Sequence, residues 1–213
     1  QGIFRVTREI PHQHAVFAVL IGASYFLGAK LGFALTFQPQ PVSTLWLPNA
    51  ILLGGLLLVP TSSWWLVLLT AFPAHLLVEV NSGIPLPMVL SWFFSNCSEA
   101  LIGAACIRRF TRSPFRLDQL SNVGIFAAAG VAATLLSSLL DASFVTVNGW
   151  GDSPFWAVWR HRTMSNLLAI FTVVPVILAL PSLKENLRLA PLSRYLEAVV
   201  LALALVAVSL LVF

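Results

Sequence analysis

The feature that most constrains this chain is a succession of long apolar segments separated by short polar connections. Seven segments stand out, covering residues 15–37, 45–59, 62–80, 87–110, 121–140, 155–180 and 195–213. Most have the roughly 20 residues that a helix needs to cross the hydrocarbon core of a bilayer. Only 9% of the residues are charged, whereas soluble domains carry about 25%. The sequence therefore predicts an all-α, polytopic transmembrane bundle and excludes an ordinary water-soluble enzyme.

Basic residues are unevenly distributed among the connections. The connections after the first, third and fifth segments, residues 38–44, 81–86 and 141–154, contain neither Lys nor Arg. Nine of the 12 basic residues lie before the first segment, after the fourth or after the sixth: Arg5, Arg8, Arg108, Arg109, Arg112, Arg116, Lys184, Arg188 and Arg194. If every segment spans the membrane, these nine share one side, which the positive-inside rule assigns to the cytoplasm. We therefore expect seven spans with a cytoplasmic N-terminus.

Segment 45–59 is short for a span, but treating it as re-entrant would move the arginines of 108–116 outside, against the charge rule. The connections are too short for a folded extramembrane domain, so residues 1–213 are expected to form a single membrane domain. Seven spans leave Phe213 at the outer face. A cytoplasmic signalling domain would then require an eighth span beyond it.

Ionisable residues inside the predicted spans are the strongest indication of a site. A charge in lipid costs about 2.5–3.5 kcal/mol on insertion scales, so such side chains should face the bundle interior or pair with one another. All but Glu99 fall in the outer half of their span. The set is Lys30, His75, Glu79, Glu99, Asp141, Arg160 and Arg162. We expect a polar, partly hydrated cavity that opens toward the periplasmic side.

Helical spacing groups several polar residues on common faces. His75 and Glu79 are four residues apart, as are Arg162 and Asn166, and such pairs share a helix face. Two longer stripes of small and polar residues should face other helices. These stripes are Trp92, Asn96, Glu99 and Gly103 in one segment and Gly130, Thr134, Ser137 and Asp141 in the next.

Structural roles remain open for the same residues. Lys30, Arg160 and Arg162 could extend to the outer interface instead of entering the cavity. His75, Glu79 and Glu99 could serve as interhelical hydrogen-bonding groups. The Gly28–Gly32 pair matches a GxxxG motif, which more often marks helix packing than a specific dimer. Spacings typical of metal sites are absent from the sequence, and Cys97 and Cys106 are too far apart on one helix to form a disulfide.

The order of several motifs resembles the first membrane-associated sensor family, MASE. Leu45-Trp46-Leu47-Pro48-Asn49-Ala50 opens an apolar helix, and Trp64–Trp65 follows it. Ser95-Asn96-Cys97-Ser98-Glu99-Ala100-Leu101 then leads to Arg108–Arg109. Trp156, Trp159, Asn166 and Pro175 complete the pattern. The chain departs from the family at Ser165–Asn166, where a Gly-Asp pair is usual, and at Leu47 and Asn49, where a second Pro or a Gly is usual.

The resemblance implies a bacterial inner-membrane input domain of about eight helices, fused to an output such as a histidine kinase or a diguanylate cyclase. We expect it to detect a small ligand from the periplasm or membrane, to act as a homodimer, and to need neither catalysis, cofactor, metal nor nucleic acid. The candidate cavity residues are Lys30, Trp46, Asn49, His75, Glu79, Asn96, Glu99, Asp141, Arg162 and Asn166. The alternatives are a transporter or substrate-binding membrane subunit, and a membrane enzyme using His75 and Glu79.

The charge distribution makes a direct prediction about topology. Reporter fusions at Arg112 and Asn148 should report cytoplasm and periplasm respectively, because an expected span of the bundle separates them. Paired alkaline phosphatase and fluorescent-protein fusions measure the two locations. If both positions reported the same side, the assignment of spans would be wrong.

Overall fold

The computed structural model describes residues 12–36, 43–111, 115–189, 191–194, 196–197 and 199–200. Its regular elements are helices: α1 (His12–Ala34), α2 (Leu47–Leu58), the short 3-10 helix η1 (Thr61–Ser63), α3 (Trp64–Asn81), α4 (Leu86–Phe110), α5 (Leu120–Val147) and α6 (Phe155–Leu189). Apart from an isolated bridge between Thr36 and Ser43, the described residues contain no β-structure. The prediction of an all-α fold is confirmed.

The chain forms two compact units, which divide after residue 178. The first contains α1 to α5 and most of α6, and it holds every interhelical contact discussed below. The second contains the last part of α6 and short helical stretches among the described residues of 191–200. The candidate site lies wholly within the first unit.

Five helices are long and apolar enough to cross a membrane: His12–Ala34, Thr61–Asn81, Leu86–Phe110, Leu120–Val147 and Phe155–Pro181. They correspond to five of the seven predicted spans. The segment predicted at 45–59 forms α2, whose 12 residues extend about 18 Å, short of a hydrocarbon core of about 30 Å. The segment predicted at 195–213 lies mostly outside the described residues. The spanning of these two segments, and the orientation of the bundle, stay predictions.

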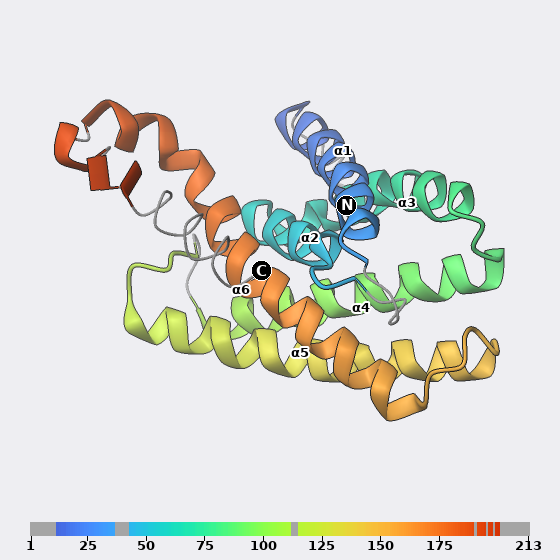
Figure 1. Ribbon diagram of the computed structural model, residues 1–213. Helices are drawn as coiled ribbons and strands as arrows, with labels where there is room; N and C mark the ends of the chain where they lie inside the picture. The colour runs from blue at the N-terminus through green and yellow to red at the C-terminus, as the bar shows by residue number, and fades with distance from the viewer. Residues whose placement is uncertain are drawn as a thin grey trace, which may run out of the picture. The chain divides into compact units, whose positions relative to one another are not determined.

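Helix α2 is the centre of the first unit, and Figure 1 shows it between the α1–α3 pair and the helices α4 and α6. Pro48, in its first turn, suits the start of a helix, and Pro60 follows its end. Every residue from 48 to 57 is buried. A helix that is hydrophobic on nearly all sides is stable only when neighbouring helices surround it. Helix α2 therefore has a packing role in the centre of the bundle.

Small residues allow the helices around α2 to approach closely. A Cβ added at Gly28 would meet Ile51 and Leu47 of α2 at 2.6 and 3.2 Å, and one at Gly32 would meet the Trp46 ring at 2.8 Å. The GxxxG motif of α1 therefore packs within the chain. On the other side of α2, a Cβ at Gly54 would lie 2.8 Å from Ile177 of α6.

The carboxyl end of α2 is held by an arginine from another helix. The Nη2 group of Arg108, near the end of α4, donates to the carbonyl oxygens of Leu57 at 3.0 Å and Val59 at 2.6 Å, with Leu56 at 3.4 Å. The last carbonyls of a helix have no partners within it and favour a nearby cation. Arg108 thereby satisfies groups that would otherwise be stranded inside the bundle.

Helix α5 is longer than predicted. It continues from Leu120 to Val147, whereas the predicted apolar segment ended at residue 140, next to Asp141. The structure places the Asp141 carboxylate 2.7 Å from the Arg162 guanidinium. Since an ion pair reduces the cost of burying each charge, the helix can continue past the acid.

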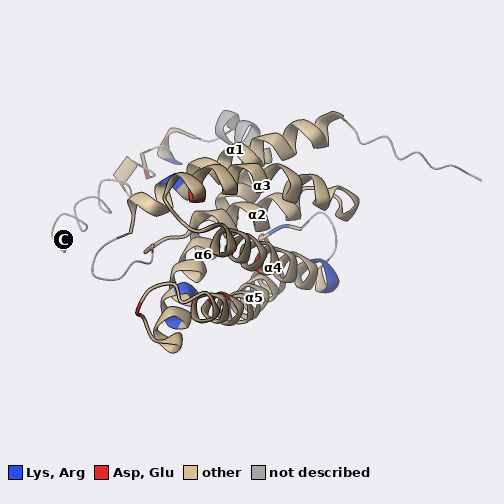
Figure 2. Ribbon diagram, turned by 90° about the vertical axis from the view of Figure 1, so that its right-hand side faces the viewer, with Lys and Arg blue, Asp and Glu red and all other residues tan. Residues whose placement is uncertain are grey.

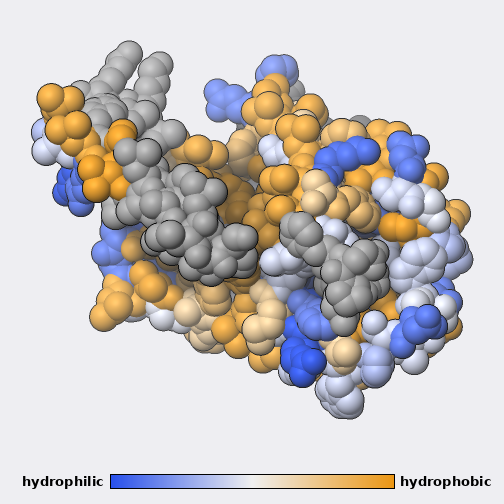
Figure 3. Space-filling view, in the orientation of Figure 1, coloured by the Kyte–Doolittle hydropathy of each residue, from blue (hydrophilic) through white to orange (hydrophobic). Residues whose placement is uncertain are grey.

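The outer faces of these helices are strongly apolar. Large exposed hydrophobic side chains occur along them, among them Val19, Leu27, Leu69, Leu77 and Leu136. Figure 2 shows few Lys, Arg, Asp or Glu residues along the helical ribbons, and Figure 3 shows broad hydrophobic surface on one face of the molecule. In water such patches would drive aggregation, so this surface is suited to acyl chains.

The contact between α1 and α3 can be tested at Gly22. A Cβ there would lie 2.7 Å from the backbone oxygen of Thr70, whose hydroxyl already bonds to the Ala18 carbonyl. Replacing Gly22 by Ala should lower the free energy of unfolding by about 1–3 kcal/mol because the helices must separate. Gly124→Ala, with open space around the added methyl group, is the control, and SDS titration in mixed micelles measures both. Equal stability of the two variants would contradict the close packing.

Candidate functional site

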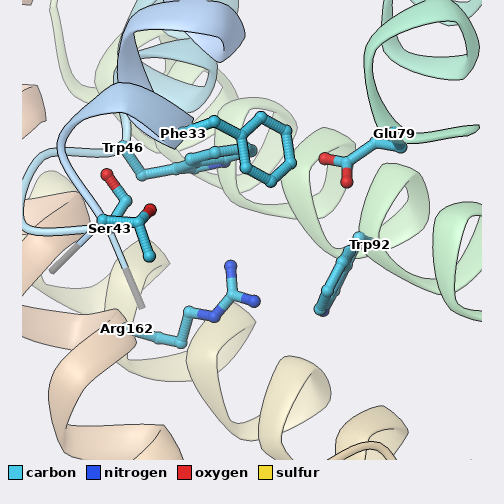
Figure 4. A pocket seen from close by; sticks show the side chains of 7 residues that line it. Phe33, Ser43, Trp46, Glu79, Trp92 and Arg162 are labelled. Carbon is cyan, nitrogen blue, oxygen red and sulfur yellow. The ribbon is translucent and has the colours of Figure 1, made fainter. Parts of the chain in front are cut away.

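A small cavity lies among helices α1, α3, α4 and α6 and the residues that precede α2. Its volume is about 60 Å³, and it is lined by Phe33, Thr36, Ser43, Trp46, Glu79, Trp92 and Arg162. Figure 4 shows the Arg162 guanidinium extending toward the space between the Trp46 ring, the Glu79 carboxylate and the Trp92 ring. The cavity thus combines a cation, an anion and aromatic walls.

The lining residues all come from one end of the first unit. Phe33 lies in the last turn of α1, Trp46 immediately precedes α2, and Glu79 is in the last turn of α3. Trp92 and Arg162 lie in the second and third turns of α4 and α6. This end carries the described residues 35–36 and 43–46 and the connections 82–85 and 148–154, whereas Arg108 and Arg109 lie at the opposite end of α4.

Arg162 is held in place by an acid and an aromatic ring. Its Nε atom lies 2.7 Å from Oδ2 of Asp141, and its guanidinium carbon lies 4.9 Å from the centroid of the Trp92 ring. Both side chains of the ion pair are largely buried, with 14% and 6% exposure. Within the described residues, the terminal Nη groups of Arg162 have no hydrogen-bond partner. They are available to a group that enters the cavity.

Glu79 supplies the opposite charge. Its side chain is 1% exposed, and neither carboxylate oxygen has a hydrogen-bond partner among the described residues. Oε1 lies 3.8 Å from Nδ1 of His75, four residues earlier, so the predicted sharing of one face is confirmed. No ion pair joins Glu79 to Arg162 in the described part of the chain. Two opposite charges therefore line the cavity without neutralising each other directly.

His75 lies beside the cavity in a hydrogen-bonded chain. Its Nε2 lies 2.8 Å from the carbonyl oxygen of Val89, and its Nδ1 lies 3.0 Å from the Tyr25 hydroxyl. The Asn96 amide in turn donates to Tyr25 at 2.9 Å. Because a carbonyl only accepts, Nε2 carries the proton and Nδ1 accepts from Tyr25. Both ring nitrogens are thus engaged by α1 and α4, which favours a structural role for His75.

Glu99, near the middle of α4, has its own partners. Its Oε2 accepts hydrogen bonds from Ser137 of α5 and from Asn166 of α6, the latter at 2.8 Å. All three residues are buried. Asn49 of α2 is buried as well, but its amide makes no hydrogen bond to Glu99. These contacts connect three helices at mid-bundle depth.

Two basic residues of the predicted set lie outside this interior. The prediction that Lys30 lines the cavity is wrong: its side chain is exposed, with Nζ 5.9 Å from the centroid of the Phe26 ring. Its long aliphatic stem lets the ammonium lie on the surface of α1. Arg160 is exposed as well. Of the remaining candidates, Trp46, Glu79 and Arg162 line the cavity, Asp141 supports it, and the others lie deeper.

Several residues that build this interior were not among the predicted site. Tyr25 is fully buried and links α1 to α3 and α4, but a lone tyrosine in an apolar helix carries no distinctive signal. Phe33, Thr36 and Ser43 line the cavity from an end of α1 and from a connection. Ser137 was visible only as part of a polar stripe. Their contribution depends on which helices adjoin, which spacing along one helix does not specify.

The chemistry available here is recognition of a small polar group. Among the described residues, no group of three or more His, Cys, Asp or Glu could hold a metal ion. Both cysteines are free. The cavity is instead lined by side chains of both charges and by aromatic residues. Such features suit the binding of a ligand by ion pairing and stacking.

These observations define a multi-pass helical membrane domain with a polar interior. The family model MASE1 matches residues 17–213, and the chain belongs to this family of membrane-associated sensor domains. The domain is therefore a membrane sensory input domain. Comparison with curated proteins and with solved structures finds no match to this chain.

The hydrogen bonds to Glu99 predict energetic coupling between α4 and α6. Asn166→Ala should lower the free energy of unfolding by about 0.5–2 kcal/mol, because it leaves a buried carboxylate oxygen with fewer donors. In a Glu99→Leu background the same change should cost clearly less. A double-mutant cycle in mixed micelles measures the difference, with Asn122→Ala, whose amide donates to the Arg116 carbonyl, as the control. Additive effects of Asn166→Ala and Glu99→Leu would show that the two residues act independently.

Proposed function

We propose that this domain detects a small ligand in the cavity lined by Trp46, Glu79, Trp92 and Arg162 and passes the signal to a cytoplasmic output domain. The observation that carries the proposal is that Glu79 and Arg162, two oppositely charged and largely buried residues, line one cavity without bonding to each other. Buried charges left in this way are costly and mark functional sites in membrane proteins. A ligand that satisfies them would gain binding energy.

The position of the cavity supports a periplasmic input. It lies at the end of the bundle opposite Arg108 and Arg109, which the positive-inside rule places in the cytoplasm. A ligand reaching it would come from the outer face or from the outer half of the bilayer. The bacterial inner membrane is the setting that the family resemblance implies.

Two elements connect the cavity to the opposite end. Helix α2 begins beside Trp46 and ends at the carbonyl groups held by Arg108. Helix α6 carries Arg162 near its start and continues to Leu189. A ligand that binds one arrangement of these helices better than another would shift the population between them. A ligand with equal affinity for both would transmit nothing.

The output that we propose is a histidine kinase or a diguanylate cyclase in the same polypeptide, acting as a dimer. The gene sequence beyond Phe213 provides a direct check. A further span followed by a kinase or cyclase module would support the sensor. A stop codon soon after Phe213 would favour the transporter-like alternative.

A mutation pair in the full-length protein tests the proposed function. Arg162→Ala should change basal or stimulated output about fivefold or more, in keeping with usual coupling energies, while membrane insertion is retained. Arg160→Ala removes an exposed arginine from the same helix and should leave output unchanged. Arg162→Lys retains the charge and separates loss of folding from loss of cavity geometry. Output is measured by phosphorylation or cyclic dinucleotide assay, and equal output of all variants at equal membrane levels would refute the proposal.

A further inference from the structure

The two charged groups of the cavity each have bonding capacity that the protein leaves unused. Glu79 presents two carboxylate oxygens without hydrogen-bond partners in the described chain. Arg162 is bound through Nε to Asp141, so its two terminal Nη groups face the cavity with no partner among the described residues. Glu79 therefore provides hydrogen-bond acceptors on one wall of the cavity, and Arg162 provides N–H donors on the other.

The charges are also arranged so that a simple ion would suit the cavity poorly. The Arg162 guanidinium is already balanced by Asp141 at 2.7 Å. An added anion would meet Arg162 but would lie near two carboxylates, Asp141 and Glu79. An added cation would meet Glu79 but would share the cavity with the guanidinium. Either ion would therefore face at least one like charge in a largely buried site.

We propose that the cavity binds a small zwitterion, an amino acid of about the size of glycine or β-alanine, with its ammonium on Glu79 and its carboxylate on Arg162. This inference rests on the proposed sensory function and names the class of ligand for that same site. Each charged end of such a ligand meets its opposite, and the net charge of the site does not change. A bidentate guanidinium–carboxylate contact adds directional hydrogen bonds.

The ammonium should carry N–H groups. Glu79 has two free acceptor oxygens, and satisfying them requires N–H donors. A quaternary ammonium has none, although it could stack on the aromatic walls. The ligand therefore belongs to the amino acids and not to the betaines.

The size of the cavity sets the scale of the ligand. A volume of about 60 Å³ accommodates roughly four to six water-sized groups, which agrees with the five non-hydrogen atoms of glycine. The rings of Phe33, Trp46 and Trp92 form the remaining walls. They would contact the carbon skeleton of the ligand and exclude water from its charged ends.

Isothermal titration calorimetry on the chain in lipid nanodiscs tests this assignment with defined probes. Glycine and β-alanine are compared with glycolate, which lacks the ammonium, and with glycinamide, which lacks the carboxylate. At least one of the two zwitterions should bind about tenfold or more tightly than both single-charge analogues, because each loses one charged hydrogen-bonded contact. Glycine betaine should also bind more weakly than glycine.

Substitutions of the two charged residues test whether each contributes to zwitterion binding. Glu79→Gln and Arg162→Gln should each weaken zwitterion binding about tenfold or more, whereas Asp118→Asn, at an exposed acid outside the cavity, should not change it. The thermal unfolding midpoint of each variant in nanodiscs checks that weakened binding is not a general loss of fold. Equal affinity for the zwitterions and their analogues, no binding of either zwitterion, or unchanged affinity in both Gln variants would overturn the proposal.

The outcome is distinguishable from failure of the proposed function. If cavity variants alter output in the full-length protein but neither zwitterion binds, the sensory proposal stands and the ligand assignment is wrong. If zwitterions bind as expected and output never responds to cavity variants, the site binds amino acids but does not serve the proposed signalling. The two measurements therefore decide separate questions.

Discussion

A bilayer supplies no hydrogen bonds to buried side chains, and this constraint organises the whole first unit. The acids Glu79, Glu99 and Asp141 are turned inward among six helices, where lipid cannot reach them. Glu99 and Asp141 find partners on neighbouring helices. The apolar side chains are left for the outside, as Figure 3 shows on one face. The central position of α2 follows, because a short helix that is apolar except for Asn49 fills the space between the polar walls.

The polar interior has two parts with different properties. In the deeper part, Tyr25, His75 and Asn96 satisfy one another, and Glu99 is held by α5 and α6. Such closed networks fix the relative positions of helices. Nearer the end of the bundle, Glu79 and Arg162 keep unused hydrogen-bonding capacity. The cavity thus lies above a closed hydrogen-bond network and keeps polar groups that have no partner. A molecule that bonds to these groups would contact several helices at once.

The sequence was sufficient to predict the helices and most of the inward-facing charges. Apolar length located five helices that are long enough to span a membrane, and the cost of charge in lipid identified Glu79, Glu99, Asp141 and Arg162. Lys30 satisfied the same criterion but is exposed, because a flexible stem lets its ammonium leave the interior. Tyr25, Phe33 and Ser43 were missed because their roles arise from contacts between helices. Spacing within one helix reports which face a residue occupies but not which neighbour lies against that face.

The contact between Arg108 and the end of α2 bears on how the domain is made. The arginine lies 49 residues after Val59, whose carbonyl oxygen it binds. During synthesis α2 therefore emerges long before its stabilising partner exists, and at 12 residues it is a poor candidate for independent insertion. Its settled position requires α4 to be in place. Biogenesis of this bundle is thus expected to be cooperative, with the central helix among the last to take up its final environment although it is second in the chain.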